Sequence, residues 1–155
     1  MSERDKEKLT KNIIAGLPGG TTDSIQDLNN FQDILATYKT IDAATLRDNL
    51  VSFLQAITPV AEEVDAKLAI HPDDPPFPLL GLPRILSDKK DVAYIFEKVN
   101  SPNNGLCFCT GSFGVRPDND LPAMVAEFGD RIHFIHLRAT KRLSLIHISE
   151  PTRPY

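Results

Sequence analysis

The sequence predicts an α/β protein with a parallel β-sheet, because three short apolar runs alternate with segments of helical periodicity. Parallel strands are expected at about residues 67–71, 104–110 and 131–137. Helices between consecutive strands favour right-handed crossover connections within one sheet. Hydrophobic and charged contents of 41% and 25% are ordinary for a globular protein, so the 155 residues allow one moderate core.

Two helices are predicted in the N-terminal half. A charged segment over residues 1–22 precedes an amphipathic pattern over residues 25–38, for which Asp23 or Ser24 can serve as N-cap. A second apolar stripe from Leu46 to Ile57 predicts another helix, which Pro59 is expected to kink or divide.

The C-terminal half alternates strands with helices. Residues 67–71 form a short apolar run before Pro72, which predicts a buried strand. A helix is expected over residues 87–100 with Ser87 as its cap, and another over residues 118–129 that stops at Gly129. The small residues of "TGSFG" (110–114) predict a turn, whose backbone could approach a substrate or an anion.

Composition narrows the class of protein. The net charge of −4 gives no basic surface for nucleic acid, and no apolar run approaches the roughly 18 residues of a membrane helix. The charged start "MSERDKEKLTKN" is unlike a signal peptide. The two cysteines of "CFC" cannot bridge each other within one strand, which indicates a reducing compartment. We therefore expect a cytoplasmic protein with neither nucleic acid nor membrane as partner.

The three predicted strands each end in a potential metal ligand, namely His71, Cys109 and His136. In parallel α/β barrels the active site lies at the C-terminal ends of the strands, so these side chains are expected at one rim. Imidazole and thiolate suit a divalent metal, and three protein ligands with open positions are typical of a catalytic site. Ligand softness alone favours zinc or iron over manganese.

Strand alternation leaves some choices open. Cys107 and Cys109 share a face, so either could turn inward, although Cys109 lies nearer the rim. His133 is expected to face away from His136. Each strand-end residue also has a plainer interpretation, as a buried small hydrophobe or as part of a rigid turn.

Four further residues are candidates for substrate binding. Arg84 and Arg138 follow the rim, where an arginine can hold a carboxylate in bidentate fashion, although surface ion pairing is the commoner role. Asp73 and Asp74, in "HPDDPP", could contact substrate or only brace the loop.

Four longer motifs resemble the mannonate dehydratase family of hexuronate and glucuronate catabolism. They are "NIIAGLPG", "PVAEEVDAKLAIHPDDPPFPLLGLPRI", "NGLCFCTGSFGVRPDNDL" and "FGDRIHFIHLRAT", and the resemblance runs from about residue 8 to about residue 141. It implies that residues 1–142 form part of a (β/α)₈ TIM barrel. It also implies Mn²⁺- or Fe²⁺-dependent dehydration of D-mannonate to 2-keto-3-deoxy-D-gluconate. The family's metal-binding histidines and cysteine carry over to His71, Cys109 and His136.

The resemblance also implies what the chain lacks. Family members are about twice as long or more, with further barrel on both sides. They carry another acidic ligand beside a catalytic histidine, which would lie beyond residue 142. The general acid or base is therefore not assigned, and the isolated chain is expected to be inactive. A homo-oligomer is one candidate state of the full-length protein.

The last residues, 143–155, read "LSLIHISEPTRPY" and resemble a translated sequencing adapter. We predict that this segment is not native protein, with a genuine irregular tail as the alternative.

Two other functions stay open on the sequence alone. One is another metal-dependent sugar isomerase or nuclease-type barrel, and the other is a catalytically inactive metal-binding fragment.

Overall fold

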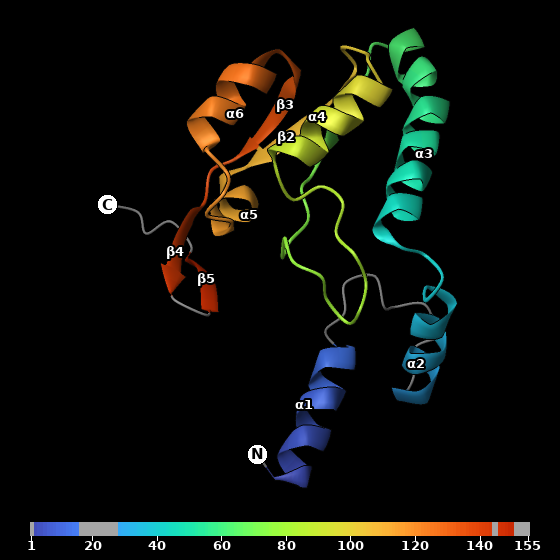
Figure 1. The fold of residues 1–155 in the computed structure, drawn as a ribbon, viewed down its shortest axis with the longest axis vertical. Helices are drawn as coiled ribbons and strands as arrows, with labels where there is room; N and C mark the ends of the chain where they lie inside the picture. The colour runs from blue at the N-terminus through green and yellow to red at the C-terminus, as the bar shows by residue number, and fades with distance from the viewer. Residues whose placement is uncertain (1, 16–27, 144–145, 151–155) are drawn as a thin grey trace. The chain divides into compact units, whose positions relative to one another are not determined.

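The computed structural model describes residues 2–15, 28–143 and 146–150, and the chain divides into two compact units, residues 1–41 and 42–155 (Figure 1). The described part of the first unit contains helices α1 (Glu3–Ala15) and α2 (Leu28–Thr37). Ser2 and Asp5 cap α1 reciprocally, because the Ser2 hydroxyl accepts from the Asp5 N–H and the Asp5 carboxylate accepts from the Ser2 backbone. The predicted helix at residues 25–38 is confirmed from Leu28 onward. Its predicted caps, Asp23 and Ser24, lie outside the described residues.

The second unit is built on a three-stranded parallel sheet in the order β1-β2-β3. Its strands are β1 (Leu68–Ile70), β2 (Asn104–Cys109) and β3 (Ile132–His136), so the three predicted strands and their parallel direction are confirmed. The prediction that residues 67–71 are buried is wrong. β1 is an edge strand of this sheet with Ala69 exposed, while β2 is buried along its whole length.

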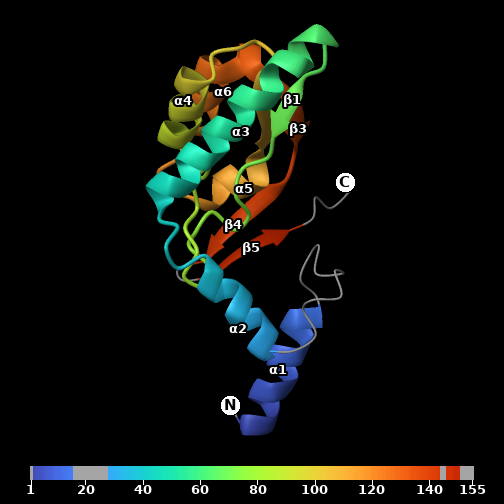
Figure 2. The same cartoon turned by 90° about the vertical axis from the view of Figure 1, so that its right-hand side faces the viewer.

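Helices cover one face of the sheet. Figure 2 shows α3 (Ala43–Glu63), α4 (Lys89–Lys98) and α6 (Leu121–Phe128) on the same side of the strands. Leu106 and Phe108 of β2 point into the core between sheet and helices, where they join Leu54, Ile95 and Met124. Because side chains alternate along a strand, Gly105, Cys107 and Cys109 face the other way.

Two features of the helices differ from the prediction. α3 runs unbroken through Pro59, so the helix is not divided there, and Asp42 caps it by accepting from the Thr45 N–H. α4 is capped by Asp88, whose carboxylate accepts from the N–H groups at the start of the helix. Ser87, the predicted cap, instead donates its N–H to Asp91 in the first turn of α4 and its hydroxyl to Asp73 in the loop.

The segment after β2 is helical where the sequence predicted a turn. α5 (Thr110–Val115) contains two glycines and is almost entirely buried. Cys109 caps it, because the Cys109 sulfur accepts from the Ser112 N–H. At the end of α6, Gly129 has a φ of −51° and begins a 3₁₀ turn, η1 (Gly129–Arg131), so the helix does not close with a left-handed glycine.

Arg131 stabilises the end of the sheet at which the strands begin, away from His71 and His136. Its guanidinium donates to the carbonyls of Phe96, Val99 and Asn104 and lies 3.7 Å from the centre of the Phe96 ring. Two of these carbonyls belong to the C-terminal turn of α4, where the helix dipole favours a cation.

β4 (Ala139–Leu143) and β5 (Ile146–Glu150) form an antiparallel pair beyond the sheet. All of β5 and the last residue of β4, Leu143, lie within the segment predicted to be non-native, and that origin stays a prediction. Among the residues that the structure describes, no helix has the length and apolarity needed to cross a membrane.

Candidate metal centre

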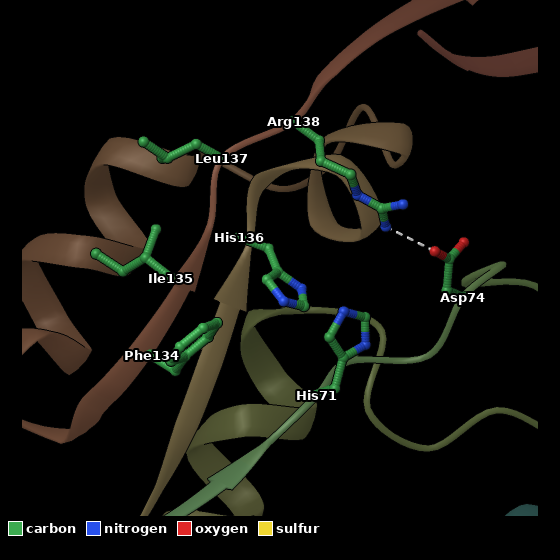
Figure 3. Close-up of a pocket in the computed structure, with 7 residues that line it drawn as sticks. All are labelled: His71, Asp74, Phe134, Ile135, His136, Leu137 and Arg138. Carbon is green, nitrogen blue, oxygen red and sulfur yellow. Dashed lines mark hydrogen bonds and ion pairs between the residues drawn. The ribbon is translucent and has the colours of Figure 1, made fainter. Parts of the chain in front are cut away.

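The ends of the three parallel strands bring two histidines together. His71 directly follows β1, and His136 is the last residue of β3, where it pairs in register with Cys109 at the end of β2. The centres of the His71 and His136 rings are 5.1 Å apart, and Figure 3 shows the rings turned toward one another. The predicted convergence of these strand ends is therefore seen in the fold.

A thiol lies beside the two imidazoles, and it belongs to Cys107. One ligand atom from each of His71, Cys107 and His136 lies within 4.8 Å of the others. Two ligands of one zinc-like ion, at 2.0–2.3 Å each, are at most about 4.6 Å apart. Small side-chain rotations would thus suffice for all three to reach one cation, and the donor set fits a divalent metal.

Cys109, the cysteine predicted as ligand, makes a different set of contacts. Its sulfur is fully buried and accepts from the Ser112 N–H at 3.4 Å, the Ser112 hydroxyl at 3.2 Å and Arg138 Nη2 at 3.3 Å. The geometry thus places the Cys107 sulfur beside the histidines, while the Cys109 sulfur caps the start of α5. The assignment of Cys109 as a ligand stays a prediction, with Cys107 as the alternative.

The two thiols differ in how readily they ionise. Burial raises the pKa of Cys107, and the charge of Cys109 raises it further. Burial also acts to raise the pKa of Cys109, but hydrogen bonds from Ser112 and Arg138 outweigh it, so the pKa of Cys109 is lowered. The distance from the sulfur to the histidines therefore favours Cys107 as the sulfur ligand. The lowered pKa favours Cys109, because a thiol binds metal as the thiolate.

A pocket of about 430 Å³ opens beside the histidine pair. Its polar groups are those of the two imidazoles and of an ion pair between Arg138 Nη2 and Asp74 Oδ2 at 2.7 Å, drawn as a dashed line in Figure 3. The pocket combines cationic, anionic and metal-binding groups, as a small polar ligand would require. The lining residues are His71, Asp74, Phe134, Ile135, His136, Leu137 and Arg138.

Arg138 ties the three strand ends together. Nη2 donates to Asp74 after β1, to Cys109 at the end of β2 and to Ser112 in α5. The Arg138 N–H also donates to the Thr110 hydroxyl at 2.8 Å. Gly111 leaves room for the guanidinium, because a Cβ there would lie 2.6 Å from Arg138 Nε.

The other two predicted substrate-binding residues do not line this pocket. Asp73 Oδ2 accepts from the backbone N–H groups of Ile85 and Leu86 and from the Ser87 hydroxyl. Arg84 Nη1 lies 3.8 Å from Asp73 Oδ1. In this arrangement Asp73 braces the loop that follows His71, which is the second of the two roles open from the sequence.

The expectation that His133 faces away from His136 is wrong. The pairing of β2 with β3 shifts by one residue, since Leu106 pairs with Ile132 but Cys107 pairs with Phe134. His133 is therefore a bulged residue, and strict alternation fails there. Its ring lies over Gly105, on the face that Cys107 and His136 share.

Sequence reasoning also missed the apolar part of the pocket. Phe134, Ile135 and Leu137 flank His136 and are 56%, 54% and 74% exposed. An apolar run interrupted by one histidine at a strand end was the available signal. The run was interpreted only as a strand, since exposure depends on what covers the sheet.

Comparisons with known proteins agree with one another. The family described as D-mannonate dehydratase (UxuA) matches residues 1–150, which confirms the resemblance seen in the motifs. Proteins named mannonate dehydratase from Brucella canis and Brucella melitensis are 56% identical over 142 residues, which is 92% of this chain. The chain spans 35% of the length of these curated relatives. The crystal structure of mannonate dehydratase from Streptococcus suis serotype 2 superposes with a TM-score of 0.68 at 36% identity, covering 72% of this chain and 33% of that one.

Proposed function

Because this chain belongs to the D-mannonate dehydratase family, we propose that the protein carrying it removes water from D-mannonate to give 2-keto-3-deoxy-D-gluconate. The observation that carries the proposal is the His71–His136 pair with a neighbouring thiol, set at the strand ends of a chain that matches the family over residues 1–150. The activity is proposed for the whole protein, of which this chain spans about a third by comparison with its relatives.

The complete fold is proposed to be a (β/α)₈ barrel. The support is the order of three adjacent parallel strands with their helices on one face, together with the similarity to the Streptococcus suis structure. The other face of the sheet, which carries Cys107 and His136, would then be the inside of the barrel. Its strand ends would form the mouth of the active site.

The proposed cofactor is Mn²⁺ or Fe²⁺. His71 and His136 would hold it with one sulfur, from Cys107 or Cys109, and imidazole with thiolate suits iron better than manganese. When bound, a divalent cation stabilises the negative charge that develops on substrate oxygens. No general acid or base is assigned to a residue of this chain.

Dehydration removes a proton from the carbon beside the substrate carboxylate and a hydroxyl from the next carbon. A sugar acid of this kind needs a cation for its carboxylate and polar partners for its hydroxyls. Arg138 offers the cation and Asp74 an acceptor, and both line the pocket beside the histidines. Apolar Phe134 and Leu137 would limit access of water on the other side.

The test is an assay of the keto product from D-mannonate by the full-length protein. Metal is first removed and then Mn²⁺ or Fe²⁺ is restored. We expect His71→Ala and His136→Ala to abolish turnover. Glu127→Gln, on the exposed surface of α6 where Glu127 pairs with Lys89, should leave turnover unchanged. Equal activity of all three variants would exclude the rim as the active site.

The 155-residue chain alone is expected to be inactive, because the resemblance places the acid or base beyond residue 142. The full-length protein is proposed to act in the cytoplasm, in glucuronate catabolism, on a small sugar acid. Turnover of D-mannonate by the 155-residue chain would overturn the first of these expectations.

A further inference from the structure

We propose that His133 is a positioning residue of this site, whose imidazole reaches across β2 to the backbone of β1 and so holds His71 beside His136. His133 is not among the residues that line the pocket, so it would act through the strands. The inference rests on the metal site of the proposed function, because its value to the protein is the placement of a proposed ligand.

The first observation is the bulge in β3. His133 is the extra residue between Ile132, which pairs with Leu106, and Phe134, which pairs with Cys107. A bulge redirects a side chain and is common next to active sites. Here it turns the His133 ring onto the face of the sheet that carries Cys107, instead of the face covered by helices.

The second observation is the space above Gly105 in the middle strand. A Cβ on Gly105 would lie 2.3 Å from His133 Cε1 and 2.4 Å from His133 Nδ1. Any other residue at position 105 would therefore collide with the ring. Because Gly105 has no side chain, the His133 ring can cross β2 and reach β1. The two outer strands β1 and β3 do not pair directly in the sheet.

The third observation is the bond made at the far side. His133 Nδ1 lies 2.7 Å from the carbonyl oxygen of Leu68 in β1. A carbonyl only accepts, so Nδ1 carries the proton and donates it. This hydrogen bond joins β3 to β1 over β2, and it spans 65 residues of sequence.

The bond matters because β1 is short. β1 has three residues, and His71 follows immediately after Ile70. The carboxylate of Asp73, two residues beyond His71, is held by the Ile85 and Leu86 N–H groups. His71 is thus fixed on one side by the Asp73 brace and on the other by the His133 bridge. Loss of the bridge should let β1, and His71 with it, move relative to His136.

The test compares His133→Leu, which removes the donor but keeps bulk, with His133→Asn, whose amide can still donate to Leu68. Each chain is titrated with Co²⁺, read by the absorption of cobalt bound to thiolate. Hydrogen exchange of the peptide that covers β1 is measured in parallel, without metal. Arg131→Gln is the control, because it removes hydrogen bonds at the other end of the sheet, where the strands begin.

We expect H133L to weaken Co²⁺ binding by about tenfold, as loss of a supporting contact around a metal site typically does. Exchange in β1 should become faster in the same variant. H133N should retain most of the affinity. R131Q should lower the melting temperature but leave Co²⁺ affinity unchanged, which separates positioning from general stability.

Unchanged Co²⁺ affinity and unchanged β1 exchange in H133L would overturn the inference. So would an H133N variant as weak as H133L, because the donated hydrogen bond would then not be the cause. If the unsubstituted chain does not bind Co²⁺ at all, the proposed metal site is wrong. The exchange rates of β1 then decide alone, with faster exchange in H133L supporting the bridge and equal exchange refuting it.

Discussion

Replacing Asp73 with alanine is expected to loosen the loop that follows His71, because one carboxylate oxygen serves three donors. Asp73 Oδ2 accepts from the Ile85 N–H at 2.8 Å, the Leu86 N–H at 2.7 Å and the Ser87 hydroxyl at 3.1 Å. Ile85 and Leu86 are only 8% and 4% exposed, so water would replace the carboxylate only in part.

The expected loss in the free energy of unfolding follows from these donors. A buried donor left without an acceptor costs about 1–3 kcal/mol, so two backbone N–H groups suggest about 2–6 kcal/mol. Some water will enter the vacated space, and we expect Asp73→Ala to lower the free energy of unfolding by about 3 kcal/mol. Asp73→Asn keeps one acceptor oxygen of the same shape and should cost about 1 kcal/mol.

Urea unfolding followed by far-ultraviolet circular dichroism measures both variants. The matched control is Asp74→Ala, one residue along, whose carboxylate pairs with Arg138 at a site where the two side chains are 47% and 37% exposed. An exposed ion pair contributes about 0–1 kcal/mol, so the control should stay near the unsubstituted chain. Equal stability of D73A and D74A would refute the account of Asp73 as a brace.

Three other predictions concern the core, a helix cap and a thiol. Met124→Ala should cost about 3 kcal/mol in urea unfolding, because Met124 is fully buried in the core, and a cost below about 1 kcal/mol would contradict that packing. Asp88→Ala should cost about 1 kcal/mol in thermal unfolding while Asp88→Asn, which still caps α4, should cost less. Arg138→Gln should raise the pKa of Cys109, because the substitution removes the positively charged guanidinium that reaches the Cys109 sulfur. The pKa is measured from the ¹³Cβ shift of Cys109 during a pH titration. Because the pKa of Cys109 is lowered by folding, ionisation of Cys109 stabilises the folded state at a pH above the unfolded pKa. This stabilisation is lost as the pH falls through the folded pKa, and R138Q should diminish it. An unchanged titration of Cys109 in R138Q would contradict the prediction.

The parallel strands could be predicted because they follow from patterns local in sequence. Short apolar runs before Pro72 and on either side of the α6 segment can form only a few topologies once helices separate them. That topology brings His71 and His136 to one rim without any knowledge of side-chain contacts. The same reasoning could not choose between Cys107 and Cys109, because the two share a face and the choice depends on the contacts of Ser112 and Arg138.

Other features depend on contacts far apart in sequence. The bulge at His133 follows from how β2 and β3 pair, and alternation along β3 alone cannot reveal it. α5 forms despite two glycines, because Phe113 is fully buried in the core and Cys109 caps the first turn. Tertiary packing thus overrides the low helix propensity of "TGSFG". Pro59 lies on the exposed side of α3, where the helix continues through it.

We propose that the rim carrying His71 and His136 holds the metal ion of the dehydratase proposed above. X-ray absorption spectroscopy of the chain loaded with one equivalent of Co²⁺ tests this most directly, because it counts nitrogen and sulfur ligands. We predict two imidazole nitrogens and one sulfur among the cobalt ligands. Of the two single variants Cys107→Ser and Cys109→Ser, one should lose the sulfur ligand and the other should keep it. A spectrum with oxygen ligands alone, unchanged by His136→Ala, would contradict the account.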